Sequence, residues 1–132
     1  MRRLDQTTFV AVRQLTVGDV DEAAALGVRL IVNNRPDGEE PGQPPSAEIE
    51  SATRAAGLDY RHIPIAGAFP PERVEAMAEA LEQGPVLAFC RTGTRSTFLW
   101  ALARAARGAP AEESVAAAAA AGYDLGPIRA WL

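Results

Sequence analysis

Lysine is absent from this chain of 132 residues, and all 13 of its basic residues are arginine. This absence excludes catalysis through a lysine Schiff base or a Ser–Lys dyad. It also excludes a Walker-type loop, in which a lysine binds the phosphates of a nucleotide. Mechanisms that depend on an amine side chain are therefore not available to this protein.

Cysteine and histidine each occur only once, at Cys90 and His62. A single cysteine cannot form an internal disulfide. The chain also has neither a CxxC motif nor the cluster of cysteine and histidine that binds zinc. We therefore expect no metal and no cofactor.

Long apolar segments are missing as well. No run approaches the roughly 18 apolar residues of a membrane-spanning helix, and residues 1–8 lack the apolar stretch of a signal peptide. The net charge of -4 and the isoelectric point near 5.0 argue against general binding to nucleic acid or to an anionic membrane. We expect a cytoplasmic protein with neither kind of partner, whose oligomeric state the sequence leaves open.

The remaining composition is that of an ordinary globular protein, with 48% hydrophobic and 23% charged residues. The length predicts a single domain over residues 1–132. Short apolar runs predict strands, and helix-type patterns between caps or prolines predict helices. The expected strands are 9–13, 28–33, 59–65 and 85–89, and the expected helices are 16–27, 46–57, 70–81, 96–107 and 111–121.

This alternation predicts an α/β fold, with a mainly parallel sheet of about four to five strands flanked by helices. Ligands of such sheets bind beyond the carboxyl ends of the strands. Three loops follow expected strands, at 34–45, 66–69 and 90–95. We expect them to lie on one face of the protein.

The stretch AFCRTGTRS, residues 88–96, places the only thiol between an expected strand and an expected helix. The first N–H groups of a helix are unpaired, and a tight turn can gather them into an anion-binding nest. Such a nest and a nearby arginine, Arg91 or Arg95, would lower the pKa of Cys90. Alone, a cysteine is more often a small buried hydrophobe, but this setting favours a functional thiolate.

The other residues of this turn have expected roles around the thiolate. Gly93 lets the backbone curl inward, and Arg95 can clamp an oxyanion with its planar fork. Ser96 can cap the helix or donate a hydrogen bond to the sulfur. We expect a small anionic substrate to contact the rest of the turn as well, through Arg91, Thr92, Gly93, Thr94 and Ser96.

The Cys-x-x-Gly-x-Arg-Ser pattern resembles the active loops of two thiolate families, the tyrosine and dual-specificity phosphatases and the rhodanese sulfurtransferases. Nearly the whole chain resembles the phosphatase domain of beta-lactamase hydrolase-like proteins (DUF442). The residues that carry this closer resemblance are Gln14-Leu-Thr, Val32-Asn-Asn-Arg-Pro-Asp-Gly-Glu-Glu-Pro-Gly-Gln-Pro, His62-Ile-Pro-Ile and Phe89-Cys-Arg-Thr-Gly-Thr-Arg-Ser. The resemblance implies a dual-specificity-phosphatase-like fold in which Cys90 is the nucleophile and Arg95 the oxyanion clamp.

The chain departs from the phosphatase pattern at three places. Four residues, 91–94, separate the cysteine from the arginine, whereas phosphatases carry five and rhodaneses four. Phe89 replaces the histidine that precedes the phosphatase cysteine. Ala66-Gly-Ala stands where phosphatases carry the aspartate that protonates the leaving group.

The 34–45 loop contains Asp37, Glu39 and Glu40, and one of them could be a substitute acid or a partner that orients Arg95. We name Asp37 as a candidate proton donor, although a solvated loop with Asp37-Gly38 as a turn is the more ordinary interpretation. Arg35 could bind the anionic part of a substrate or pair with these carboxylates. His62 is more simply explained as a structural, hydrogen-bonded histidine than as a base.

Three functions stay open at this point. The first is a phosphatase-like hydrolase in which Cys90 attacks a phosphoryl group held by the loop amides and Arg95. The second is a rhodanese-like sulfurtransferase that carries a persulfide on Cys90, as the shorter loop suggests. The third is a non-catalytic module that binds anions or senses oxidants. The resemblance over the whole chain favours the hydrolase.

Overall fold

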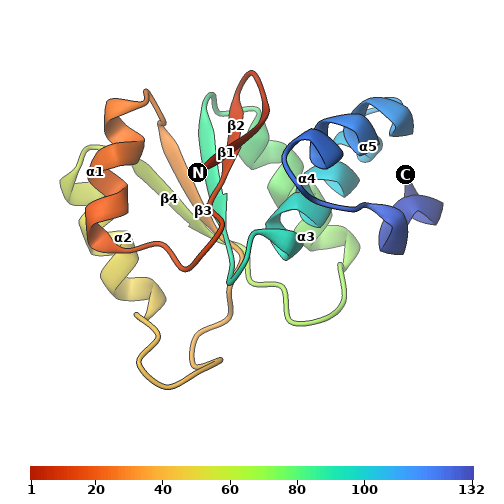
Figure 1. The fold of residues 1–132 in the computed structure, drawn as a ribbon. Coiled ribbons are helices and arrows are strands. Elements are labelled where there is room, and N and C mark those ends of the chain that lie inside the picture. Colours follow the sequence, from red (N-terminus) through yellow and green to blue (C-terminus); the bar gives the residue numbers. More distant parts are fainter.

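The computed structural model describes residues 1–132 and contains a five-stranded sheet with helices on both faces (Figure 1). The strands are β1 (Arg2–Asp5), β2 (Thr8–Val10), β3 (Leu30–Asn33), β4 (Asp59–His62) and β5 (Val86–Phe89). The helices are α1 (Val17–Ala25), α2 (Ser46–Ala55), α3 (Pro71–Leu81), α4 (Thr94–Ala106) and α5 (Ala111–Ala120), followed by the short 3-10 helix η1 (Gly126–Trp131). The predicted α/β class is confirmed.

The sheet has the strand order β1-β2-β5-β3-β4. The strands β2, β5, β3 and β4 run parallel to one another, and only β1 is antiparallel to its neighbour β2. The mainly parallel sheet is thus as predicted, but β1 was not expected. Its sequence, RRLD, contains a single apolar residue, Leu4, and forms an edge strand that the apolar pattern cannot reveal.

Alternating side chains of the central strands fill two separate cores, because successive residues of a strand point to opposite faces. On β5, Val86 and Ala88 pack into a cluster of 19 buried residues together with α3 and α4. Leu87 and Phe89 pack into a second cluster of 11 buried residues together with α1 and α2. Burial on both faces explains why β3 and β5 read as continuous apolar runs.

The carboxyl ends of three parallel strands are level with one another. Asn33 at the end of β3 pairs in register with His62 of β4 and with Phe89 of β5. The loops 34–45, 63–70 and 90–93 therefore leave the sheet at the same edge, the lower edge in Figure 1. The expectation that these loops share one face is confirmed.

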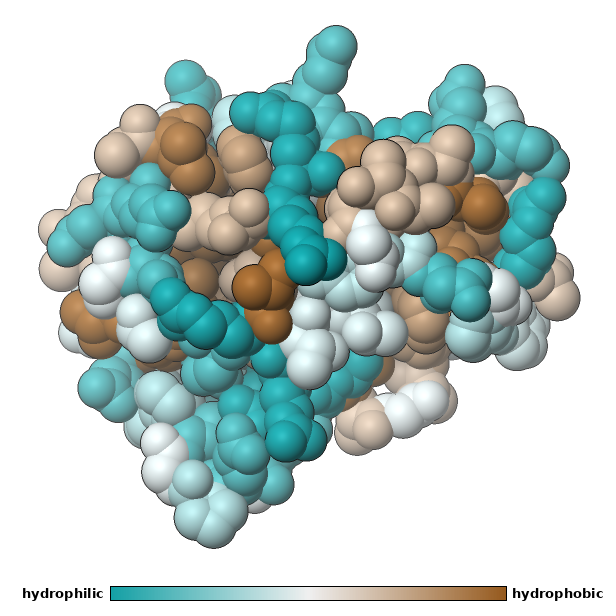
Figure 2. Space-filling model, in the orientation of Figure 1, coloured by the Kyte–Doolittle hydropathy of each residue, from teal (hydrophilic) through white to brown (hydrophobic).

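The loop that follows β3 forms a polar projection beside this edge. Figure 2 shows that the lower left part of the surface, where this loop projects in Figure 1, is hydrophilic. None of the helices combines the length and the apolarity needed to cross a membrane.

Candidate active site

The only cysteine lies where β5 turns into α4. Gly93 precedes the helix with φ of 92°, a left-handed conformation that glycine adopts without strain. This conformation lets α4 begin at Thr94, two residues before the expected start. The first turn is fixed by Thr97, whose backbone N–H and hydroxyl both donate to the Gly93 carbonyl, at 2.9 and 2.7 Å.

Backbone amides converge on the sulfur of Cys90. The Gly93 N–H donates to Sγ at 3.2 Å. Burial raises the pKa of the Cys90 thiol, but hydrogen bonding from the N–H groups of Ser96, Thr92 and Gly93 and from the Ser96 hydroxyl outweighs burial. The pKa therefore lies below the ordinary value of 9.0. The Ser96 hydroxyl is buried and has no hydrogen-bond partner within bonding geometry, so its proton is free to turn toward the sulfur.

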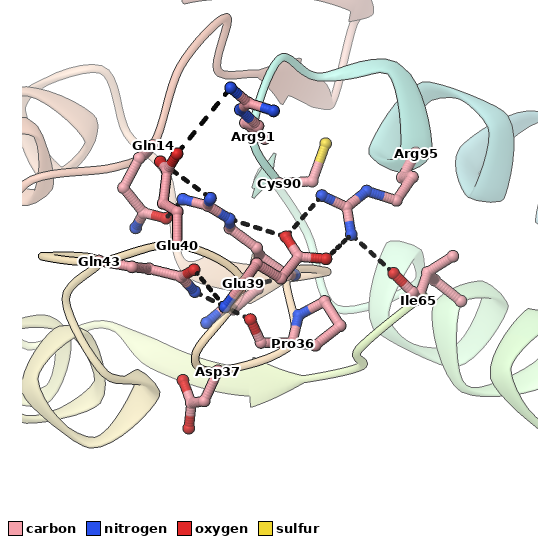
Figure 3. A network of polar contacts seen from close by, with 12 residues as sticks. Gln14, Pro36, Asp37, Glu39, Glu40, Gln43, Ile65, Cys90, Arg91 and Arg95 are labelled. Carbon is pink, nitrogen blue, oxygen red and sulfur yellow. Dashed lines mark hydrogen bonds and ion pairs between the residues drawn. The ribbon is translucent and has the colours of Figure 1, made fainter. Parts of the chain in front are cut away.

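Arg95 lies beside Cys90 and is held by two partners (Figure 3). Its Nη1 and Nη2 atoms donate to the two carboxylate oxygens of Glu39, at 2.7 and 2.9 Å. Nη1 also donates to the carbonyl oxygen of Ile65 at 2.8 Å. These contacts fix the plane of the guanidinium and connect the cysteine loop to the two other loops at this edge of the sheet.

Glu39 is in turn held by Arg35, one of the largest fully buried side chains of the protein. Nε of Arg35 donates to Glu39 at 2.9 Å, Nη1 donates to Gln14 at 2.9 Å, and Nη2 lies 3.0 Å from a carboxylate oxygen of Glu40. Hydrogen bonding from Arg95 is the largest of the effects that lower the pKa of Glu39 to about 2. Glu39 is therefore ionised at neutral pH.

The other residues expected to bind substrate lie in different surroundings, some exposed and one buried. The Arg91 side chain is 67% exposed and lies 3.9 Å from Glu40, on the outside of the loop. The hydroxyls of Thr92 and Thr94 face each other at 3.2 Å on the exposed surface. Arg35 pairs with the carboxylates, which is one of the two alternatives that the sequence left open. Its binding to a substrate stays a prediction.

The candidate acid Asp37 lies at the start of α2. Its Oδ1 accepts a hydrogen bond from the backbone N–H of Ser46 at 2.7 Å, and Figure 3 shows its carboxylate directed away from Cys90. Asp37 thus supplies the cap that Pro45, which precedes the helix, cannot supply. His62 contacts the carbonyl oxygen of Arg35 at 2.9 Å, in agreement with a structural role.

The loop that follows Ile65 carries no acidic side chain and forms one wall of an apolar groove of about 550 Å³. Phe98 and Leu102 of α4 line the same groove. They follow Arg95 by three and seven residues, so all three lie on one side of the helix. The groove therefore lies on the same side of α4 as Arg95, although Arg95 does not line it. Its other lining residues are Gly67, Ala68, Phe69, Val74, Pro127, Ile128 and Trp131.

Residues 1–107 match the model of the family described as beta-lactamase hydrolase-like protein, phosphatase-like domain. The chain belongs to this family. A beta-lactamase hydrolase-like protein of Agrobacterium fabrum is 43% identical over an alignment of 101 residues, which covers 72% of this chain and 23% of that protein. The chain thus spans about a quarter of the length of the curated relatives that it matches.

Solved structures show the same fold. A candidate phosphatase of Neisseria meningitidis is 38% identical, with a TM-score of 0.83 over 98% of this chain and 93% of that one. The phosphatase Tk-PTP in its active form is 18% identical, with a TM-score of 0.72 over 98% and 90% of the two chains. The chain is therefore a phosphatase-like domain with the fold of the cysteine-dependent tyrosine and dual-specificity phosphatases, as the sequence resemblance implied.

A loop carboxylate that orients Arg95 was one of the alternatives from the sequence, and the structure shows that Glu39 makes this contact. Nothing in the local pattern shows that Glu39, rather than Asp37 or Glu40, reaches Arg95. Tyr123 was not considered at all, yet its hydroxyl donates to the Thr92 carbonyl of the cysteine loop at 2.8 Å. The two residues are 31 positions apart, and no spacing rule connects them.

Proposed function

We propose that this chain is a cysteine-dependent phosphatase that hydrolyses phosphate monoesters, with Cys90 as the nucleophile and Arg95 as the oxyanion clamp. The observation that carries the proposal is the Gly93 N–H directed at Sγ of Cys90 at 3.2 Å, together with the lowered pKa of that thiol. The same donors that stabilise a thiolate also stabilise the equatorial oxygens of a phosphoryl group.

Arg95 retains donors for a substrate. A guanidinium carries five N–H groups, and contacts with Glu39 and Ile65 occupy three of them. The two that remain, one at Nε and one at Nη2, form an edge suited to two oxygens of a phosphate. Hydrogen bonding to Glu39 is the largest cause of the raised pKa of Arg95, and the charge and hydrogen bonding of Cys90 add to it, which supports the placement of this edge beside the sulfur.

The proposed reaction has two steps. The thiolate of Cys90 attacks phosphorus in line, so that an S–P bond forms and the P–O bond to the leaving group breaks. Water then attacks the cysteinyl-phosphate, which releases inorganic phosphate and restores the thiolate. Only 1% of Cys90 is exposed, so contact between substrate and sulfur requires the surrounding loop to open slightly.

The site favours substrates with good leaving groups. Asp37 is engaged with α2, Glu39 is ionised, and Glu40 is paired with Arg35. Without a positioned acid, hydrolysis of an alkyl phosphate loses an acceleration of about 10²–10⁴-fold, whereas the aryloxide of an aryl phosphate can leave without protonation. The apolar groove on the same side of α4 as Arg95 can accommodate the aryl group. We therefore propose aryl phosphates as the preferred substrate class.

The direct test is turnover of p-nitrophenyl phosphate, compared with an alkyl phosphate, by the wild type and by Cys90→Ser. We expect the wild type to hydrolyse the aryl ester and to be inhibited by vanadate, and we expect Cys90→Ser to be inactive. An intact-mass spectrum of the wild type, quenched in acid during turnover, should show one added phosphoryl group. Absence of both turnover and adduct in a folded protein would contradict the proposal.

The four-residue spacing between Cys90 and Arg95 favours one alternative, a rhodanese-like sulfurtransferase. A parallel incubation with thiosulfate distinguishes it, because that activity adds one sulfur atom to Cys90 and releases sulfite. Tight binding of anions with no adduct from either reagent would instead indicate a non-catalytic anion-binding module.

A further inference from the structure

Tyr123 contacts the cysteine loop from a part of the chain that lies outside the match to the family model. It follows α5, whereas the match ends at residue 107. Its hydroxyl donates to the carbonyl oxygen of Thr92 at 2.8 Å. Burial raises the pKa of Tyr123, so the hydroxyl keeps its proton and can donate at neutral pH.

The contact fixes a peptide unit that also faces the sulfur. Thr92 C=O and Gly93 N–H belong to one peptide bond, and the chain has no cis peptide. In a planar trans peptide these two groups point in opposite directions. A carbonyl held outward by Tyr123 therefore directs the Gly93 N–H inward, where it lies 3.2 Å from Sγ of Cys90.

This peptide unit needs such a constraint. Glycine tolerates both signs of φ, so rotation of the unit beside Gly93 carries little steric cost. The inverted unit would turn the Thr92 carbonyl oxygen toward the thiolate and remove a donor from the anion site. Tyr123 itself is held in place by Arg2. The Cζ atom of Arg2 lies over the Tyr123 ring, 5.7 Å from its centroid, and Arg2 donates to the Ala121 carbonyl at 2.7 Å.

We propose that Tyr123 is a positioning residue, which holds the Thr92–Gly93 peptide in the orientation that directs an N–H group at Cys90. The C-terminal segment beyond the family match thus completes the anion-binding loop of this short-looped site. The inference concerns the loop and its thiol, so its test does not require that the proposed phosphatase activity exists.

The test compares wild type with Tyr123→Phe, which keeps the ring and removes only the hydroxyl. The pKa of Cys90 is measured from the thiolate absorbance as a function of pH, with Cys90→Ser as the blank. We expect the pKa to rise by about 0.5–1 unit, the effect of one weakened hydrogen bond to the thiolate. Vanadate affinity should fall about 3–10-fold for the same reason.

Tyr60→Phe is the matched control, since its hydroxyl contacts Ser46 and Asn33 and no residue of the cysteine loop. It should leave the pKa of Cys90 unchanged. Circular dichroism confirms that both variants are folded. If Tyr123→Phe is folded and has the wild-type thiol pKa and vanadate affinity, the inference is wrong. If the wild type shows no turnover but the pKa still shifts, only the proposed function fails.

Discussion

Replacing Gly93 by alanine should destabilise the protein and distort the loop around Cys90. The φ of 92° places alanine in the left-handed region. An ideal Cβ would lie 2.7 Å from the carbonyl oxygen of Ala11 and 2.9 Å from Cζ of Tyr123, and closer still to the Tyr123 hydroxyl oxygen. Ala11 cannot move away easily, because its N–H donates to Ala88 of the central strand at 3.0 Å.

Two costs add at this position. Left-handed backbone costs alanine about 1–2 kcal/mol, and the overlap with a fixed carbonyl and a tyrosine adds about 1–3 kcal/mol. We expect Gly93→Ala to lower the free energy of unfolding by about 2–5 kcal/mol. Gly108→Ala is the control, because Gly108 has φ of 88° but no heavy atom within 4 Å of its Cβ position. It should lose only the backbone cost, about 1–2 kcal/mol.

Urea denaturation of both variants measures the difference, provided that the slopes of the transitions agree with the wild type. The thiolate absorbance of Gly93→Ala should also indicate a higher pKa for Cys90, since the displaced Gly93 N–H no longer reaches the sulfur. Equal stability of the Gly93 and Gly108 variants, with an unchanged thiol pKa, would refute the close packing on which the account of the loop depends.

Two further predictions concern the carboxylates of the 34–45 loop. The pKa of Glu39 is lowered from 4.5 to about 2, so its stabilising contribution is present above pH 4.5 and is lost as the pH falls toward 2. Urea unfolding across this range should show that wild type loses about 1–2 kcal/mol more than Glu39→Gln, allowing for solvent screening of a partly exposed pair. Asp37→Asn keeps an oxygen that can cap α2 but removes the group that could donate a proton to the leaving group. We expect turnover of an alkyl phosphate to remain within about threefold of wild type. A loss near 10²-fold would identify Asp37 as the general acid.

The fold was largely predictable because the signals that define it are local. Runs such as Val86–Phe89 are apolar on both faces, and residues such as Gly27 and Gly57, with positive φ, end the helices between them. Such runs predict the parallel sheet and the edge at which its loops meet. The strand β1 escaped prediction because pairing with β2 at the edge, rather than apolar pattern, determines it.

The site was predictable only where its residues are close in sequence. Cys90, Gly93 and Arg95 lie within one turn, so the strand-to-helix pattern predicts their arrangement. The choice of Glu39 over Asp37 as the partner of Arg95 depends on how the long loop folds back across 56 residues. The Tyr123 contact depends on the packing of the C-terminal segment against the sheet, and no local pattern encodes that packing.

The most direct test of the account is the pKa of Cys90 in the wild-type protein, measured from thiolate absorbance with Cys90→Ser as the blank. The chain has no second cysteine, so the signal has a single source. The account predicts a pKa below 9.0, because inward N–H groups outweigh the cost of burial. A pKa at or above 9.0 in the folded protein would mean that the loop does not stabilise negative charge, and the proposed chemistry would have no basis.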